Sequence, residues 1–135
     1  MINTSLLITN DLTKSQFEAT AFVINNVDDS DTTVFASPTY TWIFQNVYKL
    51  NNVPNDYAMI LYEQTKTKNV LLITDQHFFF DIDRGPQLHA LYNNTKTVKS
   101  FEGDVLNFNT YIYPYSNMKL NYEGGKIEIR TGKAI

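Results

Sequence analysis

The chain has 135 residues, with 14 acidic and 11 basic side chains, a formal charge of −3 and no cysteine. The length fits one domain spanning residues 1–135, which could bury a substantial core. The lack of cysteine excludes disulfides, thiolate metal sites and a thiol nucleophile. The acidic balance argues against nucleic-acid binding, since affinity for phosphate backbones depends on clustered lysine and arginine.

The N-terminal segment has no basic region and a very short apolar run, so it is not typical of a secretory signal. No stretch approaches the roughly 20 apolar residues that span a bilayer. We therefore expect folding in a cytoplasm and no membrane contact.

Apolar residues recur at every second position in many short runs separated by turn-forming residues. A period of two is typical of half-buried strands, because successive side chains point to opposite faces of a sheet. The strands expected from this pattern cover residues 3–9, 16–25, 32–36, 57–64, 69–83, 87–92, 98–101, 105–113, 118–122 and 126–130.

Residues 40–50 are ambiguous. Their aromatic and β-branched content favours a strand, but a short helix over 39–48 is the alternative. Two hairpins are expected, one joining 57–64 to 69–83 and one joining 118–122 to 126–130. With about eight to ten strands, the pattern predicts an all-β fold, a single antiparallel β-sandwich of jelly-roll or immunoglobulin-like type.

The densest ionisable cluster includes His77, Asp81 and Asp83, which share one face of a regular strand. The two carboxylates would lie ~7 Å apart, a separation that suits a divalent cation or paired acid and base roles. The alternative, which we favour, is a polar strand face that meets solvent or pairs with Arg84.

Asp28, Asp29 and Asp31 could gather around Ca²⁺, but the glycine and glutamate of an EF-hand loop are missing, which favours a solvated turn. His77 and His89 are the two histidines, and neither accompanies a nucleophile elbow or a phosphate-binding loop. The sequence therefore predicts no enzyme, with no catalytic residues, metal site or cofactor.

A tyrosine strip is the candidate binding surface. Tyr111, Tyr113 and Tyr115, with Asn107 and Asn109, would share one strand face and could stack on a glycan or pack against another protein. The same strip could instead be the second buried face of a central strand.

Residues 101–108 and 121–129 resemble late strands of jelly-roll or immunoglobulin-like modules on phage capsids and tails. The whole chain, cysteine-free and rich in Asn, Thr and Tyr, resembles small β-sandwich virion proteins of tailed bacteriophages. Trp42 resembles the buried tryptophan of immunoglobulin domains.

The resemblance implies a non-enzymatic decoration, collar or tail accessory subunit located in the virion. It would form a homo-oligomer or symmetric array on other particle proteins. Three alternatives remain: a carbohydrate-binding module, a phage-encoded inhibitor of a host enzyme, and a hydrolase or nuclease that uses the cluster containing His77.

Overall fold

The computed structural model describes residues 14–55, 62–75, 78, 86–102 and 126–135. The elements in chain order are α2 (Lys14–Asn26), β1 (Thr32–Phe35), α3 (Pro38–Asn46), the 3₁₀ turn η1 (Tyr62–Gln64), β2 (Asn69–Thr74), α5 (Pro86–Asn94), β3 (Lys96–Phe101) and β4 (Ile127–Lys133). In the described part of the chain, no helix is long and apolar enough to cross a membrane.

The four described strands form one mixed sheet in the order β1-β2-β4-β3. Strands β1 and β2 are parallel, whereas β4 is antiparallel to both β2 and β3. The β3–β4 register shifts between Thr97 and Lys99. The last strand of the chain thus lies inside the sheet, between two strands that precede it in the sequence.

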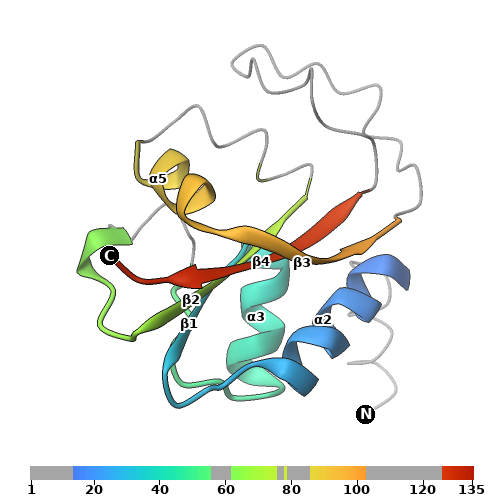
Figure 1. The fold of residues 1–135 in the computed structure, drawn as a ribbon. Helices are drawn as coiled ribbons and strands as arrows, with labels where there is room; N and C mark the ends of the chain where they lie inside the picture. The colour runs from blue at the N-terminus through green and yellow to red at the C-terminus, as the bar shows by residue number, and fades with distance from the viewer. Residues whose placement is uncertain (1–13, 56–61, 76–77, 79–85, 103–125) are drawn as a thin grey trace.

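Helices cover both faces of this sheet, so the described part has three layers (Figure 1). Helices α2 and α3 pack on one face, and α5 with η1 packs on the other. Strand β2 is buried on both faces, as its uninterrupted apolar run over residues 70–73 requires.

The core is divided by the sheet into two clusters. On the side of α2 and α3, Ala19, Val23, Tyr40 and Phe44 meet apolar residues of β1, β2 and β4. On the other side, apolar residues of β1, β2, η1 and α5 pack around Phe78. Alternate residues of β1 and β2 supply the two clusters, because their side chains point to opposite faces.

The expected all-β sandwich or jelly roll is wrong, because the structure is a mixed α/β fold with one four-stranded sheet among the described residues. The alternation of apolar residues reflects strands in the sheet, but it also occurs by coincidence in segments that form helices. Three segments expected to be extended lie in α-helices.

Residues 16–25 lie in α2, where Ser15, Ala19 and Val23 are buried. These residues are spaced four apart and line one face of a helix. Ala19 and Val23 also satisfy a period of two, which is why alternation alone misassigned them.

Residues 40–46 lie in α3, so the helical alternative was correct over this range. The helix buries Tyr40, Ile43 and Phe44 at the three- and four-residue spacing of a helix face. Ser37 is the N-cap and Pro38 begins the helix, a pair typical of helix starts.

Residues 87–92 belong to α5, which begins with Pro86 and buries Leu88 and Leu91. Residues 62–64 form η1 instead of a strand, and β2 pairs with β1 and β4, so the expected hairpin between 57–64 and 69–83 is wrong.

Strands over 32–35, 69–74, 98–101 and 127–130 are confirmed as parts of β1, β2, β3 and β4. The strands expected at 3–9, 105–113 and 118–122 lie outside the described residues.

Candidate functional site

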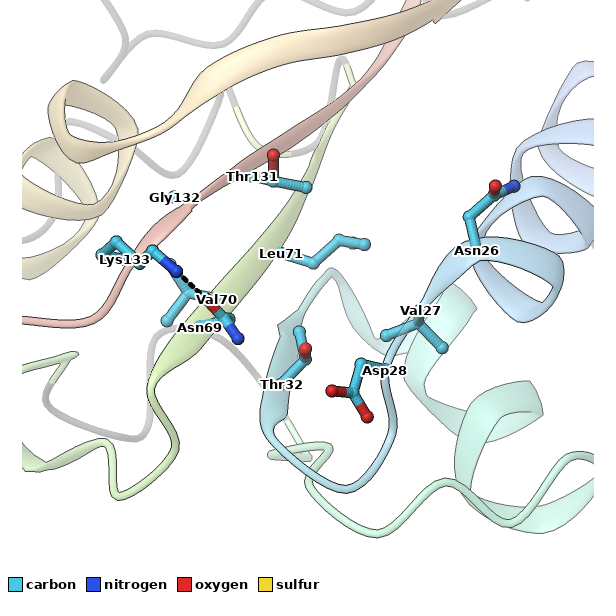
Figure 2. Close-up of a pocket in the computed structure, with 10 residues that line it drawn as sticks. All are labelled: Asn26, Val27, Asp28, Thr32, Asn69, Val70, Leu71, Thr131, Gly132 and Lys133. Atoms are coloured by element: carbon cyan, nitrogen blue, oxygen red, sulfur yellow. Dashed lines mark hydrogen bonds between the residues drawn. The ribbon is translucent and has the colours of Figure 1, made fainter.

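A pocket of about 350 Å³ opens between the C-terminal end of α2 and the sheet (Figure 2). It lies near the first residues of β1 and β2 and the last residues of β4. Its lining consists of Asn26, Val27, Asp28, Thr32, Asn69, Val70, Leu71, Thr131, Gly132 and Lys133.

The turn that forms one wall is shaped by three carboxylates with separate tasks. Asp28 Oδ1 accepts hydrogen bonds from the Ser30 backbone N–H and hydroxyl, at 3.2 and 2.7 Å. Asp29 accepts from the backbone and side chain of Asn51. Asp31 Oδ1 accepts from the Lys68 backbone N–H at 3.0 Å. The three side chains fix the loop in place, and no metal-ligating group of three was found among the described residues.

The sheet supplies the opposite wall. Strand β4 turns Ile127 and Ile129 toward the helical layer of α2 and α3, and the same alternation places Thr131 and Lys133 on that face beyond the end of α2. Lys133 Nζ donates to Asn69 Oδ1 at 3.0 Å, across the pair that β4 and β2 form in register. This hydrogen bond holds the ammonium group at the pocket edge.

Gly132 joins the pocket to the opposite layer. A Cβ at this position would lie 2.4 Å from the backbone oxygen of Asn94 at the end of α5. Only glycine lets β4 approach the end of α5 so closely.

The Asn94 side chain donates to the Tyr62 hydroxyl and to the Lys133 carbonyl. Burial raises the pKa of Tyr62 above its ordinary value of 10.0, against the lowering effect of the hydrogen bond from Asn94.

A second polar cluster surrounds Arg130 on the opposite face of β4. Its guanidinium donates to the hydroxyls of Thr95 and Thr97 at 3.1 and 3.0 Å, and to the carbonyls of Tyr92 and Thr95. It also stacks 3.9 Å from the centroid of the Tyr92 ring. These contacts join the C-terminal end of α5 to the sheet, so this cluster has a structural role.

The sites expected from the sequence lie elsewhere. His77, Asp81, Asp83 and Arg84 are outside the described residues, as is the whole tyrosine strip of Tyr111, Tyr113, Tyr115, Asn107 and Asn109. His89 is exposed on α5. Trp42 is 51% exposed on α3, so the expected buried tryptophan is wrong.

Asp75 is the described neighbour of the cluster containing His77. It is buried just after β2, and its Oδ1 accepts the backbone N–H of Phe78 at 3.1 Å. It does not line the pocket.

Sequence reasoning reached one residue of the pocket, Asp28, and treated it as part of a turn. Asn69, Thr131 and Lys133 belong to no motif, and only the strand pairing brings them beside α2. A polar residue on the inward face of an otherwise apolar strand, as at Thr131, was the available signal.

Comparison with protein-family models, with curated proteins and with solved structures gives no match to this chain. The class of the molecule is therefore described by its geometry, as a small mixed α/β domain with a polar pocket at one end of its sheet.

Proposed function

We propose that this domain is a non-enzymatic binding module that holds one small polar molecule in the pocket between α2 and the sheet. The observation that carries the proposal is the lining itself. Six of its ten residues bear polar side chains, namely Asn26, Asp28, Thr32, Asn69, Thr131 and Lys133.

The size and composition fit this role. Ligand pockets commonly have volumes of about 300–1,000 Å³ and combine apolar surface with a few converging polar groups. At about 350 Å³ this pocket suits a single small molecule, with Val27 and Leu71 as apolar surface.

Polar groups in the lining remain available to a ligand. The hydroxyls of Thr32 and Thr131 make no hydrogen bond within the described part of the chain, and neither is among its buried oxygens without a partner, so both are open to solvent. A bound molecule can replace that water with a direct hydrogen bond.

The residues of the lining favour ligand binding over catalysis. It contains no histidine or serine, and one oxygen of its carboxylate is committed to Ser30. Nucleophilic catalysis needs a nucleophile hydrogen-bonded to a base, and in the described part of the chain neither threonine hydroxyl of the lining is bonded to Asp28 or Lys133.

The test is a ligand screen on the full chain with a filled-pocket variant. Millimolar amino acids, monosaccharides, small carboxylates and nucleosides would be added while ¹H–¹⁵N NMR shifts are recorded. Thr131→Tyr places a strand-favouring aromatic ring in the pocket, and Ser100→Tyr adds the same ring on an exposed position of β3 as the matched control.

We expect at least one compound to shift pocket resonances saturably in the parent and in Ser100→Tyr, but not in Thr131→Tyr. A screen in which no compound binds, or in which binding survives Thr131→Tyr, would overturn the proposal.

The virion role and the binding of other particle proteins stay predictions. Their argument began from a complete β-sandwich, and the mixed α/β fold removes that starting point. Glycan binding also stays a prediction, and the monosaccharides in the screen address it.

A further inference from the structure

The two walls of the pocket differ in electrostatic character. Asn26, Val27 and Asp28 line one side, at the end of α2, and Asn69, Thr131 and Lys133 line the other, on the sheet (Figure 2). The two formally charged lining residues, Asp28 and Lys133, stand on different walls.

The helical wall is electronegative. Helix α2 ends at Asn26 with no basic residue in its last turn, so the partial negative charge of its terminal carbonyls has no cationic side chain of its own to offset it. The carboxylate of Asp28 adds a full negative charge beside this end. Its Oδ1 is bonded to Ser30, whereas Oδ2 accepts no hydrogen bond from any other described residue.

The sheet wall offers hydrogen-bond donors and positive charge. An ammonium group has three N–H donors, and Lys133 uses one of them on Asn69, which leaves two for a ligand. The Thr131 hydroxyl lies on the same face of β4. Together they suit the oxygens of an anionic group.

Each wall also carries an apolar residue. Val27 lies on the helical wall and Leu71 on the sheet wall. The formal charges of the lining cancel, so a ligand of one net sign would meet repulsion or an unpaired charge on one side.

We infer that the pocket takes a small zwitterion of the α-amino acid class. The ligand ammonium lies toward Asp28 and the end of α2, its carboxylate lies toward Lys133 and Thr131, and its hydrocarbon part contacts Val27 and Leu71. This inference rests on the proposed function, since it names the ligand class of the same pocket.

The experiment titrates glycine, L-serine and L-valine into the ¹⁵N-labelled full chain. Matched probes are N-acetyl-L-valine, which lacks the ammonium, L-valinamide, which lacks the carboxylate, and glucose, which carries neither charge. We expect saturable binding of at least one amino acid, and at least tenfold weaker binding of both blocked valines and of glucose.

Two variants test the orientation. Asp28→Asn keeps Oδ1 as the acceptor for Ser30 but removes the negative charge, and Lys133→Met keeps most of the apolar stem but removes the ammonium. Each should weaken amino-acid binding about tenfold or more. The controls Glu18→Gln and Lys66→Met remove exposed charges outside the lining and should leave binding unchanged.

The outcomes separate the two claims. If glucose or N-acetyl-L-valine binds as tightly as the amino acids and Thr131→Tyr abolishes that binding, the pocket stands and the zwitterion assignment fails. If none of the three amino acids binds, the assignment fails as well. If no compound shows binding that Thr131→Tyr removes, the proposed function fails with it.

Discussion

Arg130 and Lys133 are two basic residues on β4 with opposite surroundings. Arg130 faces α5, its side chain is 12% exposed, and its guanidinium bonds to hydroxyls and carbonyls at the end of that helix. Lys133 faces the pocket and is exposed, and its ammonium group has one hydrogen-bond partner in the described part of the chain. An odd separation along a strand places them on opposite faces. The comparison teaches that the donors of Arg130 are used within the fold, whereas the Lys133 ammonium keeps unused donors beside the pocket.

The largest expected effect comes from Arg130→Met. The substitution leaves the carbonyls of Tyr92 and Thr95 without their charged donor and removes the contact with the Tyr92 ring. Because hydrogen bonds to charged groups contribute more than neutral ones, we expect a loss of about 3 kcal/mol in the free energy of unfolding. Urea denaturation measures this loss. A change below about 0.5 kcal/mol, the range usual for surface substitutions, would contradict the structural role of Arg130.

The next effect concerns Gly132, which lies between the two basic residues. In Gly132→Ala the new Cβ would meet the backbone oxygen of Asn94, which cannot rotate away as a side chain would. We expect a destabilisation of about 1–3 kcal/mol from the forced backbone shift. A larger increase in hydrogen exchange, relative to the parent protein, at the end of α5 than in α2 would locate the damage at this contact. An equal increase in both helices would show that Gly132 does not act through its close approach to the Asn94 backbone.

A smaller effect, which depends on pH, is expected at Tyr62, whose hydroxyl accepts a hydrogen bond from Asn94 at the end of α5. Its pKa is raised in the folded state, so the folded protein keeps the phenol proton at pH values where the unfolded chain loses it. The resulting stability is fully present below pH 10, the ordinary pKa, and is lost as the pH rises through the raised folded-state value. The stability difference between the parent and Tyr62→Phe should therefore shrink as the pH rises above 10. Parallel urea curves at pH 9 and above 10 make the comparison, and a difference that does not change with pH would refute it.

The smallest effect on stability is expected for Lys133→Met. The lost hydrogen bond to Asn69 is exposed, so the free energy of unfolding should change by less than about 0.5 kcal/mol. Measured in the same urea experiment, this variant is the counterpart of Arg130→Met. A loss comparable to that of Arg130→Met would show that Lys133, too, serves mainly the fold.

Local pattern located several strands but not their partners. The apolar run in β2 and the alternation in β4 identify strands, because these signals depend only on neighbours in the sequence. The same alternation misled at α2, where a four-residue repeat of small and β-branched residues satisfies both periods. Ser37 and Pro38 carry a helix-start signal directly before residues 40–46, where composition favoured a strand.

By itself the sequence determined that the chain lacks cysteine chemistry and where its most apolar strands lie, since both follow from residue identity and near neighbours. Only the tertiary structure decided that β4 inserts between β2 and β3 and that β1 pairs in parallel with β2. These long-range pairings bring Asp28 and Lys133 to one pocket although they are far apart in the chain. No local pattern encodes that meeting, because strand order depends on which faces the helices cover and how the whole core packs.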